Sequence, residues 1–292
     1  MADERRIIKL KLDIIFKQMF GDAKNESVIA NFLSGILEIP RGSIKKIIME
    51  NVELVPDYHF GKFCRLDLKM QVDDKIVNIE MQLNNHNNFR ERTLYYWSRV
   101  YSDELKESDD YGKLRDTICI NIVNFNLFDC ENFHSHFKVM EKERHEVLTD
   151  TFAIHFFELK KLGKNPDKNN MMKLWLQLVN AETEEELEML ENTGVKEIRE
   201  AIVILRELNA DEKMRQLAFT REKAIRDEAN AINSARAEGI SEGRAEGRAE
   251  GIAEGRAEGI AEGRAEGITS VVEKLKARGM SDEEINEILS DE

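Results

Sequence analysis

The sequence predicts an α/β (α+β) protein in which strands and helices mix in the N-terminal part and helices alone form a C-terminal extension. Three observations predict this class. Residues 63–83 alternate between apolar and polar positions on both sides of a short acidic turn, which indicates a β-hairpin. Residues 117–125 carry few charges, which is typical of a central strand. From Asn169 onward, helical patterns rich in Glu, Lys, Leu and Ala follow one another.

The hairpin at 63–83 has a register that its pattern specifies. With the turn centred on residues 73 and 74, apolar residues face each other on one side of the two strands. The expected apolar pairs are Leu68 with Ile79 and Met70 with Val77. The expected polar pairs are Asp67 with Glu80, Lys69 with Asn78 and Arg65 with Gln82.

Two carboxylates therefore face each other across the predicted hairpin. Like charges directly opposite each other destabilise a pair of strands, so Asp67 and Glu80 need either solvent or a cation between them. A solvated hairpin face satisfies the pattern. A divalent-metal site satisfies it equally, because hard carboxylate oxygens suit Mg²⁺ or Mn²⁺.

Composition limits the class of protein further. Cys64, Cys119 and Cys130 lack the spacing of a zinc site or of a disulfide framework, which favours a reducing compartment. The N-terminus has no apolar signal core, and no apolar run approaches the roughly 20 residues that span a bilayer. We therefore expect a cytoplasmic protein without a membrane partner.

The net charge of −14 is distributed unevenly. Residues 1–100 contain 16 basic and 14 acidic side chains, whereas residues 151–292 contain 21 basic and 31 acidic ones. The acidity thus belongs largely to the C-terminal half. The N-terminal part is not barred from binding phosphates, although its charge alone does not predict nucleic-acid binding.

The remaining elements follow in order along the chain. Helical spacing predicts helices at 13–20, 25–37 and 89–105, and β-branched residues predict a strand at 44–55. Further strands are expected at 133–140 and 151–157, and further helices at 171–179, 184–192, 195–208, 211–233, 268–277 and 282–289. Ser281 and Glu284 form a capping box before the last helix. His134 and His136 share one strand face and are expected to be ordinary surface histidines.

Several polar residues on these helices allow two interpretations. Asp13 is either a charge favoured near a helix N-terminus or an acid aimed at the hairpin carboxylates. Arg92 and Tyr95 either pack along the helix at 89–105 or hold a phosphate.

A tetrapeptide repeat, Ala-Glu-Gly-Arg or Ala-Glu-Gly-Ile, occupies residues 236–268. Each glycine costs a helix about 1 kcal/mol relative to alanine, so a single helix is marginal here. The repeat is either a helical stalk stabilised by self-association, which implies a homo-oligomer, or a flexible linker. The expected organisation is a domain at 1–160, a helical region at 161–235, the repeat at 236–268 and short helices at 269–292.

The motifs together resemble the Rpn family of recombination-promoting nucleases, described as PD-(D/E)XK nuclease family putative transposases. The residues that carry the resemblance are Asp13-x-x-Phe16-Lys17, Asp67, Asn78-Ile-Glu80-Met-Gln82, Arg92 with Tyr95-Tyr96-Trp97, and the glycine-punctuated tail. The resemblance covers most of the chain from about residue 5. It implies a restriction-endonuclease-like core with a mixed central sheet flanked by helices. The lysine that is usual in the wider superfamily is Gln82 here.

The resemblance also implies Mg²⁺-dependent (or Mn²⁺-dependent) hydrolysis of DNA phosphodiesters in a bacterial cytoplasm. Asp67, Glu80 and the main-chain carbonyl of Met81 are then the expected metal ligands, with Gln82 and Asp13 as further catalytic residues. Gln82 cannot act as a general base, because an amide does not titrate in this range. Lys17, Lys69, Arg92 and Tyr95 are candidate phosphate contacts. The alternative function is a non-catalytic DNA-binding or oligomeric assembly protein that retains a nuclease-like core.

Overall fold

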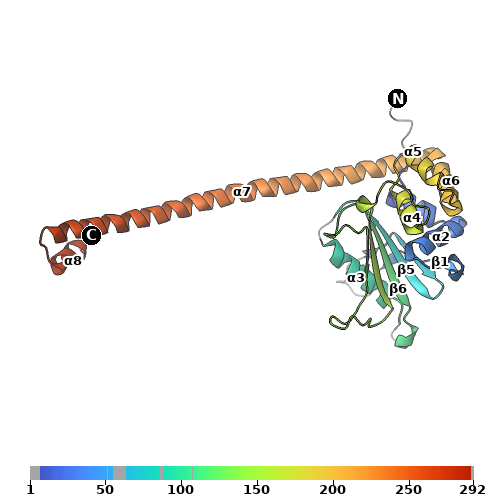
Figure 1. Ribbon diagram of the computed structural model, residues 1–292, viewed down its shortest axis with the longest axis horizontal. Helices are drawn as coiled ribbons and strands as arrows, with labels where there is room; N and C mark the ends of the chain where they lie inside the picture. The colour runs from blue at the N-terminus through green and yellow to red at the C-terminus, as the bar shows by residue number, and fades with distance from the viewer. Residues whose placement is uncertain (1–6, 51, 55–63, 86–87, 107, 291–292) are drawn as a thin grey trace, which may run out of the picture. The chain divides into compact units, whose positions relative to one another are not determined.

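The computed structural model describes residues 7–50, 52–54, 64–85, 88–106 and 108–290 (Figure 1). The chain divides into two compact units, Met1–Asp227 and Glu228–Glu292. Val55 and Phe63, at the ends of the predicted strand and hairpin, lie outside the described residues.

The first unit contains most of the secondary structure. Its helices are α1 (Asp13–Phe20), α2 (Glu26–Leu37), α3 (Phe89–Ser102), α4 (Met171–Asn180), α5 (Glu184–Glu191) and α6 (Lys196–Ala210). Its strands are β1 (Ile47–Met49), β2 (Glu53–Leu54), β3 (Cys64–Arg65), β4 (Leu68–Val72), β5 (Lys75–Gln82), β6 (Asp116–Val123), β7 (His134–Phe137) and β8 (Phe152–Glu158). Helix α7 (Glu212–Ala277) begins in this unit and continues into the second, where α8 (Asp282–Ser290) follows.

A six-stranded mixed sheet organises the first unit, with strand order β1-β4-β5-β6-β8-β7. Strands β5, β6 and β8 run parallel, whereas β1, β4 and β7 pair antiparallel to their neighbours. Strands β2 and β3 form a separate two-stranded sheet. The predicted α/β class, with a mixed sheet between helices and a helical C-terminal extension, is confirmed.

The predicted hairpin register is confirmed where β4 pairs with β5: Leu68 faces Ile79, Lys69 faces Asn78 and Met70 faces Val77. The prediction that the first strand continues back to Cys64 is wrong. The ladder ends at Leu68, and Arg65 pairs with Glu53 instead of Gln82. Likewise, the predicted strand at 44–55 is two short strands, β1 and β2, that pair with different partners. The alternation of side chains hid the break at Asp67, because the bend there preserves the apolar periodicity.

The two faces of the sheet carry different partners. Val77, Ile79 and Met81 point from β5 into the main hydrophobic core, which also contains the buried faces of α1, α2, α4, α5 and α6. Residues of the opposite parity face α3, where Phe89 packs with Cys119 and Val123 of β6. Period-two alternation places Asn78, Glu80 and Gln82 on this α3 face.

The helices after residue 161 pack into the same hydrophobic core as one face of the sheet. Trp175 of α4 packs edge-on against Phe20 of α1 and Phe32 of α2, and all three rings are fully buried. Ile198 and Leu205 of α6 belong to the same cluster. The helical region therefore contributes directly to the stability of the sheet.

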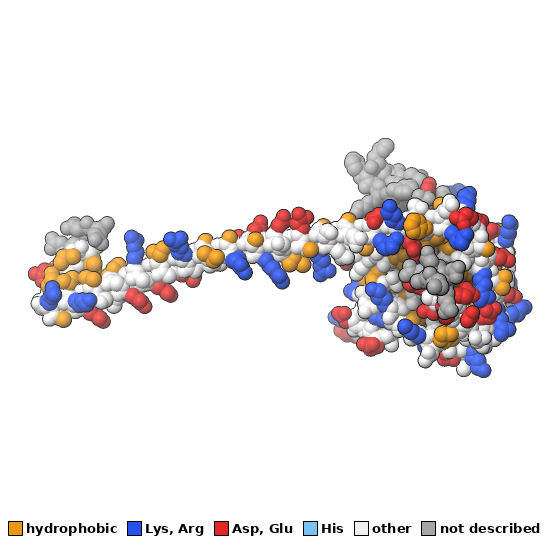
Figure 2. Space-filling model, turned by 90° about the horizontal axis from the view of Figure 1, so that it is seen from above, with side chains coloured by type: hydrophobic (Ala, Val, Ile, Leu, Met, Phe, Trp, Pro, Cys, Tyr) orange, Lys and Arg blue, Asp and Glu red, His pale blue; other side chains and the backbone are white. Residues whose placement is uncertain are grey.

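In the second unit the repeat is helical. Residues 211–233 and 268–277, which the sequence predicts as separate helices, belong with the repeat to the single 66-residue helix α7. Charged and apolar side chains alternate along it (Figure 2). The predicted capping box is confirmed, since the Ser281 N–H donates to Glu284 Oε2 (2.9 Å) and the Glu284 N–H donates to Ser281 Oγ (3.4 Å). Among the described residues, no helix is long and apolar enough to cross a membrane.

Candidate active site

The bend between β3 and β4 brings two carboxylates together. Beyond the last ladder pair, Asp67 Oδ2 accepts a hydrogen bond from the Met81 N–H (2.8 Å). In return, the Asp67 N–H donates to Glu80 Oε1 (3.2 Å). Each acid thus replaces a hydrogen bond that the strand ladder would have made, and the bend itself fixes the carboxylate pair.

The Glu80 carboxyl is difficult to ionise in this position. Burial, followed by the neighbouring charge of Asp67, raises the pKa of Glu80 to about 8. The Asp67 N–H, the Arg92 guanidinium and a hydrogen bond from Asn78 lower that pKa but do not offset the first two causes. A divalent cation between the two acids would relieve both the repulsion and the desolvation of the charged form.

Lys17 reaches Asp67 from a different element. Its Nζ lies 2.9 Å from Asp67 Oδ1, and both side chains are partly exposed. Helix α1 is held in place because Ile15, Phe16 and Met19 are buried in the main core. The structure therefore brings together Asp67, Glu80 and Lys17, as the sequence motifs suggested.

Gln82 and Arg92 form a second pair beside the acids. Arg92 Nη2 donates to Gln82 Oε1 (2.7 Å), and Gln82 Nε2 donates to the main-chain oxygen of Asn84 (3.0 Å). The Arg92 guanidinium also lies over the rings of Phe89 and Tyr96, at 4.8 Å and 5.8 Å from their centroids. Gln82 is thus fixed in orientation, with one lone pair and one N–H left for other partners.

The other predicted site residues lie differently. Asp13 forms an ion pair with Arg221 of α7, at 2.7 Å. Tyr95 is exposed on α3, whereas its neighbour Tyr96 lines the small pocket next to Glu80. The sequence did not separate these tyrosines, because both follow Arg92 at close to one helical turn.

The position of Lys69 differs from the one expected for a phosphate contact. It is buried, and its ammonium lies 3.0 Å from Glu50 and 4.0 Å from Glu104. An ammonium that is paired internally in this way does not reach a nucleic-acid backbone. Its parity placed it correctly on the polar side of the hairpin, but the charges that pack over it come from distant residues.

Sequence reasoning missed two buried polar residues near Glu80, Thr93 and Asn121, and gave no role to a third, Asn78. Asn78 is 1% exposed, and its Oδ1 has no hydrogen-bond partner among the described residues. Asn121 on β6 accepts from Thr93 Oγ1 (3.3 Å) and donates to the His155 carbonyl oxygen (3.2 Å). For Asn121 the available signal was a single asparagine within the otherwise apolar stretch 118–123 of β6, on the parity that faces α3.

The donor set fits Mg²⁺ or Mn²⁺. No cluster of three or more His, Cys, Asp or Glu side chains suited to a metal occurs in the part of the chain that the structure describes. Mg²⁺ commonly needs only one or two carboxylates, with water and substrate phosphate completing its octahedron. Asp67 and Glu80 supply two. Met81 presents its carbonyl on the same edge as its N–H, which already faces Asp67.

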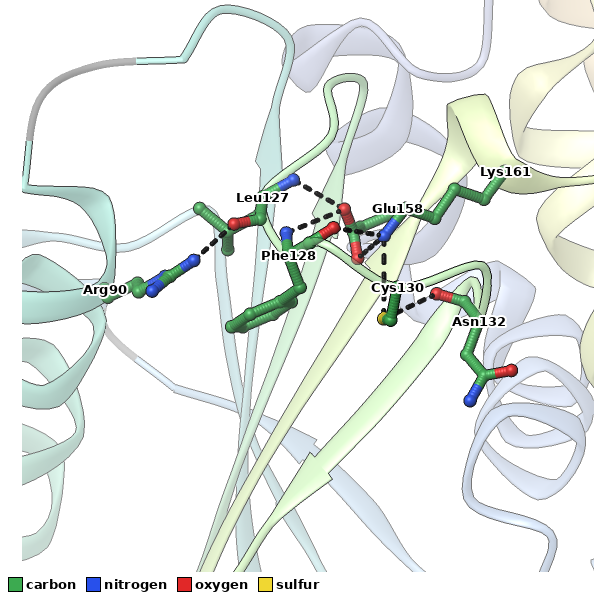
Figure 3. A network of polar contacts seen from close by, with 7 residues as sticks. All are labelled: Arg90, Leu127, Phe128, Cys130, Asn132, Glu158 and Lys161. Atoms are coloured by element: carbon green, nitrogen blue, oxygen red, sulfur yellow. Dashed lines mark hydrogen bonds and ion pairs between the residues drawn. The ribbon is translucent and has the colours of Figure 1, made fainter.

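A buried cluster of polar groups around Glu158 stabilises the fold away from the acid pair. The buried carboxylate of Glu158 accepts from the Leu127 N–H (2.5 Å) and the Phe128 N–H (3.3 Å) on one oxygen and from Lys161 Nζ (2.8 Å) on the other (Figure 3). Lys161 also donates to the Phe128 carbonyl oxygen (2.8 Å). With both oxygens satisfied, this carboxylate anchors the loop after β6.

The histidines form a stack at the edge of the sheet. His134 is half-buried and only His136 is exposed, so the expectation of two surface histidines holds for one of them. Buried His155 joins them, with its ring 4.0 Å from that of His136 and hydrogen-bonded to His134 (3.0 Å). Burial lowers the pKa of His155 to about 3. Parallel rings do not direct their nitrogens at one metal ion.

The fold and the acid pair define a protein with a PD-(D/E)XK-type nuclease core: two acids, on a bent strand and on its neighbour, followed by Gln82. The model of the PD-(D/E)XK nuclease family transposases matches residues 10–235, and the chain belongs to this family. The resemblance drawn from the motifs is confirmed.

One curated relative is the cysteine–tRNA ligase of Mesoplasma florum (strain ATCC 33453 / NBRC 100688 / NCTC 11704 / L1). It is 27% identical over 129 residues, which cover 41% of this chain and 29% of the ligase. The chain therefore spans less than a third of that enzyme. No solved structure matches the chain.

Proposed function

We propose that the protein is a metal-dependent DNA endonuclease that acts in recombination or on mobile elements, in a bacterial cytoplasm. The observation that supports it best is the reciprocal pair of hydrogen bonds that joins Asp67 to the Glu80 carboxylate and to the Met81 N–H. Membership of a nuclease and transposase family supports nucleic acid as the substrate. Mg²⁺, with Mn²⁺ as a substitute, is the proposed cofactor.

Asp67, Glu80 and the Met81 carbonyl are the proposed ligands. A divalent cation held there would polarise the scissile phosphate and lower the pKa of a bound water. Gln82 would orient that water through its remaining lone pair, while Arg92 holds the amide in place. Lys17 and Arg92 would balance the negative charge that builds up on the phosphate.

The test is cleavage of supercoiled plasmid by the purified chain. The proposal expects nicked or linear DNA with Mg²⁺ and none with a chelator, and loss of cleavage in Asp67→Ala and in Glu80→Ala. Cleavage that persists unchanged in both variants would remove the assignment. Absence of cleavage with Mg²⁺, Mn²⁺, Co²⁺ and Ca²⁺ would instead favour the DNA-binding or assembly protein.

We propose, in addition, that the repeat in α7 assembles the chain into a homo-oligomer. All eight repeat glycines, from Gly239 to Gly267, have open space where a Cβ would stand. Among the residues that the structure describes, nothing packs against these glycines to compensate for their cost to the helix, and a second helix packed against them would. Light scattering should show fewer chains per particle after deletion of residues 236–268; an unchanged number of chains per particle argues against the proposal.

A further inference from the structure

Each oxygen of the Asp67 carboxylate already has a partner in this structure. Lys17 occupies Oδ1 at 2.9 Å and the Met81 N–H occupies Oδ2 at 2.8 Å. The second contact is made by the main chain and is permanent. The first is made by a flexible ammonium whose side chain is 33% exposed, so it can leave without exposing buried apolar surface.

The nearest acid on the same helix does not compete with Asp67 for the Lys17 ammonium. Asp13 precedes it by four residues on α1, which is the spacing of a helical ion pair. Asp13 instead binds Arg221 at 2.7 Å. Lys17 is therefore directed at the acid pair, on a helix whose apolar residues fix its position.

The site also lacks a mobile cation where the wider superfamily has its lysine. Gln82 carries no charge, and its amide is held by Arg92 and by the Asn84 carbonyl oxygen. Arg92 is restrained in turn by its contacts with the rings of Phe89 and Tyr96. Lys17 touches a proposed metal ligand and, with its side chain one-third exposed, has room to move.

We propose that Lys17 is an exchangeable counter-ion: it neutralises Asp67 in the metal-free protein, leaves that oxygen when a divalent cation binds, and then positions the scissile phosphate. This rests on the proposed nuclease function. Lys17 thereby provides, from α1, the positive charge that the wider superfamily carries at the position of Gln82. Removal of the Lys17 ammonium should therefore strengthen metal binding and weaken cleavage.

The first experiment measures Mg²⁺ and Mn²⁺ binding by calorimetry in the full-length wild type, in Lys17→Met and in Lys164→Met. The last variant is the control, because it removes one exposed lysine charge elsewhere. Lys17→Met should bind metal roughly three- to tenfold more tightly, since the competing ion pair is gone, and the control should match wild type. If Lys17→Met binds the metal no more tightly than wild type, Lys17 does not exchange with the metal at Asp67.

The second experiment follows the wild-type chain directly, so it does not depend on a variant that folds. The NMR signals of the lysine side chains are recorded during Mg²⁺ titration, with Lys17 assigned by its absence in Lys17→Arg. The Lys17 signal should shift as the metal saturates. A Lys17 signal that stays constant at saturation overturns the proposal.

Cleavage assays separate this proposal from the function on which it rests. Lys17→Met should lose about 10²-fold in cleavage at saturating metal, and Lys17→Arg should recover part of it. Tighter metal binding in Lys17→Met with no cleavage by wild type would support the exchange and refute the nuclease. Wild-type cleavage with unchanged metal binding in Lys17→Met would support the nuclease and refute the exchange.

Discussion

The main-chain N–H of Asp67 donates a hydrogen bond to Glu80 Oε1 across 3.2 Å, at the point where the β4–β5 ladder ends. The bend that ends the ladder thus ties the two acids together through main-chain hydrogen bonds. A straight strand would have left the two carboxylates directly opposite each other, as an unfavourable cross-strand pair.

The raised pKa of Glu80 predicts a pH-dependent stability of the metal-free protein. Because folding raises this pKa from 4.5 to about 8, the folded state binds the proton more tightly than the unfolded state. The resulting stabilisation is complete below pH 4.5 and is lost as the pH rises through 8. Urea unfolding in a chelator should show stability falling from pH 5 to pH 9, and Glu80→Gln should flatten that fall. If the stability of Glu80→Gln fell equally steeply with pH, the titrating group would not be Glu80.

Arg92 should matter through Gln82. Arg92→Lys keeps the charge but loses the planar guanidinium that binds the Gln82 amide and stacks on Phe89. We expect cleavage to fall roughly 10- to 100-fold with little change in plasmid binding at low salt. Single-turnover cleavage and a filter-binding assay separate the two effects. A loss confined to binding would make Arg92 a simple phosphate contact, and Arg90→Lys on the same helix is the control.

Lys69 should act on stability and not on DNA binding. Lys69→Met leaves Glu50 without its partner at 3.0 Å in a mostly buried setting. A decrease of about 1–3 kcal/mol in the free energy of unfolding is expected. The salt dependence of DNA affinity should stay the same, because no phosphate contact is lost. If the DNA affinity of Lys69→Met depended less steeply on salt than that of wild type, Lys69 would be a phosphate contact after all.

Glycines in the two units should respond oppositely to alanine. A Cβ at Gly35 would stand 2.6 Å from Trp175 Cδ1, whereas one at Gly247 would meet nothing within 4 Å. Gly35→Ala should destabilise the fold by about 1–3 kcal/mol. Gly247→Ala should raise the helix content of the isolated chain while weakening the proposed oligomer. Circular dichroism at several protein concentrations checks this; a concentration-independent gain in helix would argue against self-association.

The sequence predicted the parts of the site that depend on local pattern. Alternation fixed the register at Leu68 and Ile79 and placed Glu80 and Gln82 on one face. The resemblance implied that Lys17 is a phosphate contact, and the structure places its ammonium beside Asp67. These signals depend on near neighbours in the sequence, which is why they can be read without coordinates.

The remaining features depend on contacts between distant residues. The bend at Asp67, the burial of Lys69 against Glu50 and Glu104, and the pairing of Asp13 with Arg221 all involve separate segments. A single sequence gives no measure of which charged residues will meet. The burial that raises the pKa of Glu80 is likewise a property of the packed α3 face, where Thr93 and Asn121 were not recognised.

The most direct measurement is Mg²⁺-dependent cleavage of supercoiled plasmid by wild type and by Asp67→Asn at matched protein concentration. The substitution keeps the side-chain shape and an oxygen that can accept from the Met81 N–H, so the fold should persist. Wild type should cleave the plasmid in a reaction that a chelator abolishes, and the variant should lose about 10²-fold or more of that activity. Equal cleavage by the two proteins, or wild-type cleavage that survives the chelator, would contradict the proposed function.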